Sequence, residues 1–186
     1  GLLGPPRARD HRLVAHNALQ AGSFYKAEVA RDLRRALTLL QRWPGVDPER
    51  IAVAGASLGG EIAVALAALD PRVRATAVSS HGGAVGPAAA SRRAPAGRAA
   101  EPHGCHLIPG INAILHREDW FRILAPRPLL VVRGRLNLPA GMESFTRAVR
   151  RAYRPLGAED AFRSEAADGG HEFFVEPTIR FLRDQL

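Results

Sequence analysis

The sequence predicts an α/β fold, a parallel sheet flanked by helices. Short apolar runs suited to buried strands occur at 51–54, 73–79, 128–133 and 161–165. Stretches typical of helices lie at 25–43, 61–69, 142–153 and 177–186. Strands that alternate with helices favour a parallel sheet with right-handed crossovers.

The first half of the chain supplies one helix, one strand and a second helix in that order. Apolar residues of the first helix recur on one face, and Pro44-Gly45 ends it. These residues are Val29, Leu33, Leu37 and Leu40. After a turn at 47–50, the run 51–54 suits a strand buried on both faces. The next stretch is almost continuously apolar until Asp70-Pro71 stops it.

The second half repeats the alternation. The run 128–133 is the most apolar strand of this half, and a helix follows it. The apolar positions of that helix are Met142, Phe145, Val149 and Tyr153. The last helix begins with Pro177 in its first turn, where a missing N–H is tolerated.

A nucleophile elbow is the interpretation we favour for Gly55-Ala-Ser57-Leu-Gly59, which joins the strand at 51–54 to the following helix. A serine on this strained turn needs small neighbours two residues away on each side, and Gly55 and Gly59 meet that need. Ser57 is therefore the candidate nucleophile. The N–H of Leu58, at the N-terminus of the next helix, is the candidate oxyanion donor. The alternative is a structural glycine-rich loop.

His171 is the candidate general base. It follows Gly169-Gly170 in a loop after the last strand and before the final helix, where an imidazole can take the serine proton. The other histidines lack that placement. His103-Gly-Cys105-His106 is a tempting ligand cluster, but zinc sites add ligands from a second segment, which is absent here. We therefore predict no metal, and a structural or pocket-lining role for this segment.

Four segments together resemble the α/β-hydrolases grouped with acetyl xylan esterases and dienelactone hydrolases. They are 47–80, 105–110, 118–134 and 169–173, and Ala125-Pro-Arg-Pro-Leu-Leu-Val-Val132 is especially characteristic. The resemblance implies an α/β-hydrolase fold with Ser57 as nucleophile and His171 as base. It also implies an esterase that hydrolyses acetyl or other short acyl esters through an acyl-enzyme, with no cofactor.

The acid position departs from the family pattern. Where the family has Gly-Arg-x-Asp-x-Pro, this chain has Gly134-Arg-Leu-Asn137-Leu-Pro139. Asn137 can hydrogen-bond an imidazole but carries no charge to stabilise imidazolium. Glu143 and Asp168 are conceivable substitutes outside the family position. Two hypotheses stay open, a weakened serine hydrolase and a catalytically inactive hydrolase-like fragment that serves as a binding or assembly module.

Only about fifty residues precede the elbow, fewer than the several strands of an α/β-hydrolase require. We therefore interpret 1–186 as a single domain that forms the C-terminal portion of the fold, beginning as if cut from something longer. Half of the oxyanion hole is then missing unless Gly1–Asn17 supplies a substitute. The sheet edge left exposed predicts a second copy or a partner chain.

Composition narrows the remaining classes. The net charge of +8 comes from arginines that are dispersed rather than clustered with aromatics, which argues against nucleic acid as a partner. No apolar run approaches the roughly 20 residues of a membrane span, and residues 1–10 lack the apolar core of a secretion signal. Cytoplasmic and secreted locations stay open. The Gly-, Ala-, Pro- and Arg-rich stretch 82–100 is predicted to be a flexible insertion.

Overall fold

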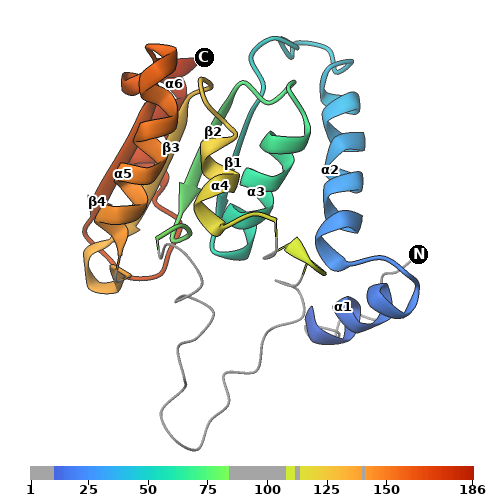
Figure 1. Cartoon of the computed structure of the whole chain (residues 1–186). Coiled ribbons are helices and arrows are strands. Elements are labelled where there is room, and N and C mark those ends of the chain that lie inside the picture. The colour runs from blue at the N-terminus through green and yellow to red at the C-terminus, as the bar shows by residue number, and fades with distance from the viewer. Residues whose placement is uncertain (1–10, 84–107, 112–113, 140) are drawn as a thin grey trace, which may run out of the picture.

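The predicted α/β fold is confirmed by a computed structural model, which describes residues 11–83, 108–111, 114–139 and 141–186 (Figure 1). Its sheet has four parallel strands in the order β1-β2-β3-β4. They are β1 (Ala52–Ala56), β2 (Ala75–Ser79), β3 (Leu129–Gly134) and β4 (Phe162–Ala167). Each strand predicted from an apolar run is present. The ends differ by one or a few residues, and β1 continues through Gly55 up to the candidate nucleophile.

Among the described residues, four α-helices occupy the predicted stretches and two others were not predicted. The predicted ones are α2 (Tyr25–Leu40), α3 (Leu58–Leu69), α5 (Met142–Tyr153) and α6 (Val175–Gln185). The two others are α1 (His11–Gln20) and α4 (Arg117–Arg122). Short 3-10 turns lie at Arg135–Asn137, Arg154–Leu156 and Glu159–Ala161. The six residues of α4 are too few to establish a helical period, which explains why the sequence did not reveal it.

Helices cover both faces of the sheet. Because side chains alternate along each strand, neighbouring residues of a strand pack on opposite faces. Leu129 and Val131 of β3 pack in a core with residues of α2 to α5, including Phe121 and Phe145. Leu130 and Val132 point to the opposite face, where they pack with Phe174 and with residues of α6. In Figure 1, α3, α4 and α5 lie in front of the sheet, and α2 stands beside α3.

A buried carboxylate ties α2 to the end of α3. Asp70 is 2% exposed, and it accepts hydrogen bonds from the guanidinium groups of Arg72 and Arg34. The bond from Arg72 holds the pKa of Asp70 well below its usual range, against the opposing effect of burial.

Arg127 donates to the carbonyl oxygens of Ala67 and Val73. This contact gives the arginine of the Ala125–Val132 block a structural role.

The sheet is open at β1. In the described part of the chain, β1 pairs only with β2, and Ala54 is exposed. Within the described residues, the backbone groups on the outer side of β1 therefore form a free sheet edge. Association through this edge stays a prediction.

Several expectations fall outside the described residues. Of the predicted insertion 82–100, only Gly82 and Gly83 are described, and His103, Cys105 and His106 are not. Among the described residues, no helix has the length and apolar character needed to cross a bilayer.

Candidate active site

Ser57 occupies a strained turn between β1 and α3. Its φ of 54° and ψ of −120° are unusual for a residue with a side chain. Its N–H donates to the carbonyl of Ser79 at 2.9 Å, and its own carbonyl accepts from the N–H of Glu61 at 3.1 Å. The amides of residues 58–60 therefore precede the first backbone hydrogen bond of α3. The strand, turn and helix have the backbone geometry of a nucleophile elbow, with the Leu58 amide at the helix start.

The steric demands of the elbow differ in one respect from the sequence-based expectation. A Cβ on Gly55 would lie 2.2 Å from the carbonyl oxygen of Gly59, so only glycine fits there. A Cβ on Gly60 would lie 2.9 Å from Val78 Cγ1. Gly59 itself has open space around the position of a Cβ. The expectation that Gly59 must be small was therefore wrong, and Gly60 carries that constraint, because its backbone lies against Val78 of β2.

Asn137 and His171 meet in the structure. The Nδ2 atom of Asn137 lies 3.1 Å from Nδ1 of His171, and both side chains are exposed. The loops that carry them pack backbone to backbone, with the N–H of Leu136 donating to the carbonyl of Gly169 at 3.1 Å. A Cβ on Gly134 would lie 2.1 Å from the carbonyl oxygen of Gly170. Gly134 thus allows the histidine loop to cross the end of β3.

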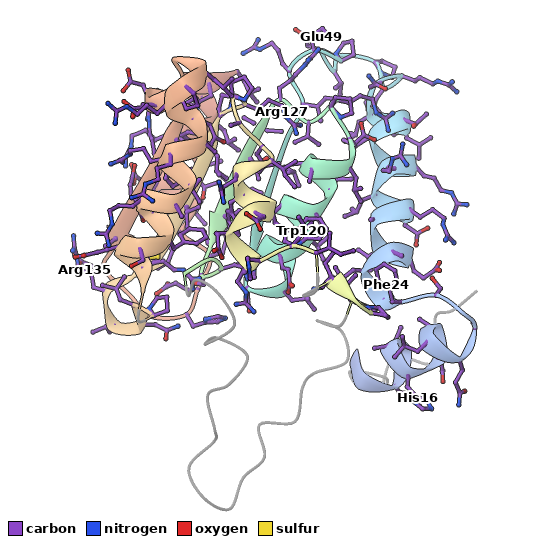
Figure 2. The ribbon with its side chains drawn as sticks, in the orientation of Figure 1. His16, Phe24, Glu49, Trp120, Arg127 and Arg135 are labelled. Carbon is purple, nitrogen blue, oxygen red and sulfur yellow. The ribbon has the colours of Figure 1, made fainter. Side chains whose placement is uncertain are left out.

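The two conceivable substitutes for the acid have other partners. Asp168 accepts from Nε of Arg135 at 3.0 Å, and Glu143 pairs with Arg147 at 3.5 Å. In the described part of the chain, neither carboxylate is hydrogen-bonded to His171. Figure 2 shows Arg135, which neighbours Asn137 in the 3-10 turn after β3, at the lower end of the sheet.

Two serines that sequence reasoning missed hold the histidine loop. Ser80 Oγ donates to the carbonyl of Glu172 at 2.9 Å and accepts from the N–H of the same residue at 3.1 Å. Ser79 Oγ accepts from the N–H of Phe174 at 3.1 Å. Both serines are buried, and Ser80 has a φ of 54°. Their position at the carboxyl end of a strand was the available signal, since ligand sites gather there in parallel sheets.

A group of ionisable side chains lies beside the elbow. Lys26 of α2 pairs with Glu61 of α3, and the two line a cavity of about 30 Å³ with His81, Arg117 and other residues. Burial lowers the pKa of His81 to about 3, and this imidazole is therefore neutral at pH 7.

A larger cleft of about 640 Å³ runs along α2, and its lining includes Phe24 and Trp120, labelled in Figure 2. In the described residues, no group of three or more His, Cys, Asp or Glu side chains is placed to hold a metal ion.

Comparison with known structures decides the fold family. The chain superposes with a TM-score of 0.76 on a Bacteroides fragilis protein described as a "putative acetyl xylan esterase", with 21% identity over 94% of this chain and 52% of that one. The chain has the α/β-hydrolase fold. A glucuronoyl esterase from Solibacter usitatus has this α/β-hydrolase fold too, with a TM-score of 0.70 and 20% identity over 88% of this chain and 50% of that one.

Sequence comparisons agree with the resemblance found in the motifs. Residues 14–81 match the family model of acetyl xylan esterase (AXE1). The "Putative hydrolase YtaP" of Bacillus subtilis is 24% identical over 98% of the chain and 62% of its own length. The chain thus spans about half of the solved structures named above and less than two thirds of this curated relative.

Proposed function

We propose that the protein is a serine hydrolase of carboxylic esters that works through an acyl-enzyme. The observation that carries the proposal is the strained backbone of Ser57, which is characteristic of a nucleophile on an elbow between strand and helix. The contact between Asn137 and His171 across two loops supports it, because a general base needs a group that orients its ring. Relatives named as acetyl xylan and glucuronoyl esterases make esters of sugars and of sugar acids the first substrates to test.

In the proposed reaction, Ser57 Oγ attacks the ester carbonyl carbon and its proton passes to Nε2 of His171. The Leu58 N–H donates to the oxyanion that forms. Collapse of this intermediate breaks the bond to the alcohol, which leaves with the proton from His171. Water, deprotonated by His171, then attacks the acyl-enzyme, releases the carboxylic acid and restores the serine. Asn137 orients the imidazole through Nδ1.

Labelling with a fluorophosphonate probe, together with hydrolysis of p-nitrophenyl acetate, tests the proposal. We expect the chain to be labelled and to hydrolyse the ester, and Ser57→Ala to lose both. Ser144→Ala is a matched control, because Ser144 is an exposed serine of α5 whose hydroxyl accepts a hydrogen bond from Arg147. Equal hydrolysis by wild type and Ser57→Ala would contradict the proposal.

A second candidate function is favoured by two observations. Asn137 stands where the family has an acid, and the edge of β1 is unpaired in the described part of the chain. Both fit an inactive hydrolase-like module that associates through its sheet edge with a second copy or a partner chain. This candidate predicts a folded chain that the probe does not label and that sediments as a dimer or larger species.

A further inference from the structure

Arg133, on β3, is a buried cation without an anionic partner in the described residues. Its side chain is 7% exposed, and its Nε atom has no hydrogen-bond partner. Burying an unpaired charge costs several kcal/mol, so buried arginines normally face a carboxylate. The buried Nε–H of Arg133 is therefore a donor that an anion could satisfy.

The neighbours of Arg133 add positive charge. Arg117, at the start of α4, is exposed. Burial, with a further contribution from the charge of Arg117, lowers the pKa of Arg133 to about 10. Arg133 remains charged at neutral pH. His81 lies near both arginines and is neutral at pH 7. The carboxylate that faces His81, Glu61, is paired with Lys26. We call Arg133, Arg117 and His81 the arginine cluster.

The register of the sheet places Arg133 two strands away from the candidate nucleophile, at the same end of the sheet. Ala56 of β1 pairs with Ser79 of β2, which pairs with Val132 of β3. Ser57 and Arg133 are the next residues on β1 and β3, so their backbones lie about two strand spacings, or roughly 10 Å, apart. By alternation, Arg133 points to the same face of the sheet as Val131, towards α4 and α5.

We propose that the arginine cluster binds a free carboxylate on the ester substrate, so that the preferred substrates are monoesters of small dicarboxylic acids or similarly acidic acyl groups. This inference rests on the proposed function for the ester half of the substrate. Arg133 donates at the base of the subsite, Arg117 closes it from the exposed side, and His81 offers an N–H without adding charge. A planar guanidinium matches a carboxylate in two parallel hydrogen bonds, which favours this anion.

Binding without turnover gives the first test. In the Ser57→Ala chain, titration calorimetry should show that monomethyl glutarate binds and that dimethyl glutarate binds with an affinity at least about 10-fold lower. The reason is that a hydrogen bond to a charged group changes affinity by roughly 10- to 100-fold. Adding Arg133→Gln should abolish this preference. The control is Arg122→Gln, which removes one positive charge from the other end of α4, where Arg122 pairs with Asp119.

Stability distinguishes a binding role from a structural one. Because Arg133 is desolvated and unpaired in the described structure, Arg133→Gln should melt at the same temperature as the wild type or higher, even as it loses the carboxylate preference. If Arg133→Gln instead unfolds the chain, Arg117→Gln, at an exposed position, should still weaken monomethyl glutarate. An unchanged preference in both variants would overturn the proposal. Inorganic phosphate that displaces monomethyl glutarate at equal concentration would overturn the carboxylate assignment.

Measurements of turnover test the carboxylate subsite and the proposed esterase function separately. In a pH-stat, wild type should hydrolyse monomethyl glutarate with a kcat/KM at least about 10-fold above that for methyl butyrate, and Arg133→Gln should equalise the two. Binding preference without hydrolysis of either ester would keep the subsite and reject the esterase. Equal hydrolysis of both esters by wild type, with no binding preference, would keep the esterase and reject the subsite.

Discussion

Replacing Asn137 with aspartate should increase esterase activity, because it restores the charge that the acid position lacks. An asparagine that donates from Nδ2 to Nδ1 of His171 leaves the ring proton on Nε2, the nitrogen that must accept the serine proton. The reversed amide accepts from Nδ1–H and leaves Nε2 free. A carboxylate only accepts, so Asn137→Asp selects the productive tautomer and also stabilises the imidazolium.

The size of the effect follows from the 3.1 Å contact. Two unit charges at that separation attract by about 1.3 kcal/mol at the dielectric constant of water and by about 5 kcal/mol at an effective value of 20. Because Asn137 and His171 are both exposed, solvent screens the pair and the lower part of this range applies. One to two factors of ten in kcat correspond to about 1.4 to 2.7 kcal/mol. We therefore expect a 10- to 100-fold rise, less than the roughly 10,000-fold effect of an acid in a buried triad.

The assay is the kcat for p-nitrophenyl acetate in wild type, Asn137→Asp and Asn17→Asp. Asn17 is an exposed residue of α1, so its substitution makes the same chemical change at a different place. Each variant is also combined with Ser57→Ala, which should remove all of the gain. An equal rise in Asn17→Asp, or no rise in a folded Asn137→Asp chain that the probe labels at Ser57, would refute the reasoning.

Three further predictions concern the supports of the site. Ser80→Ala leaves both backbone groups of Glu172 without their partner. It should lower kcat several-fold at unchanged KM, and it should lower the free energy of unfolding by about 1 to 2 kcal/mol in a denaturant titration. Ser144→Ala should change neither quantity. Gly134→Ala forces the histidine loop away and should lower the free energy of unfolding of the chain by about 1 to 3 kcal/mol. Gly59→Ala has open space around its Cβ and should leave that free energy nearly unchanged. Asp70→Asn should lower the free energy of unfolding by about 2 kcal/mol at pH 7, as measured by urea denaturation. Since the pKa of Asp70 is lowered in the folded chain, its contribution is present above pH 3.8 and is lost as the pH falls below that value, so the two proteins should converge in acid.

The strands and the longer helices were predictable because each depends on a local pattern. The apolar run of β3 and the helical spacing of α5 need no knowledge of the rest of the chain. The elbow was predictable for the same reason, since strand, turn and helix adjoin in sequence. Assigning the small-residue constraint to Gly59 failed because the close contact of Gly60 is with Val78, on another strand.

The sequence could place Ser79 and Ser80 at the carboxyl end of a strand, but it could not show that they hold the histidine loop. Ser80 and Glu172 are separated by 92 positions, and nothing in the residues around either one indicates the other. Arg133 was equally hidden, because a charged residue at the end of an apolar strand is usually exposed. Its side chain points to the face of the sheet that α4 and α5 cover, and α4 is too short to be recognised from its period. Contacts of this kind depend on how the layers pack, which local patterns do not specify.

The acid position and the arginine cluster should be coupled, since both set the charge at the carboxyl end of β3. Asn137 lies four residues after Arg133, and a carboxylate at 137 adds a negative charge on the side where the substrate carboxylate is proposed to bind. Asn137→Asp should therefore increase kcat/KM more for methyl butyrate than for monomethyl glutarate, through a higher KM for the acidic ester. A double-mutant cycle of Asn137→Asp with Arg133→Gln measures this coupling. Equal gains for the two esters in the chain that retains Arg133 would mean that the two positions act independently, and that the substrate carboxylate binds away from Arg133.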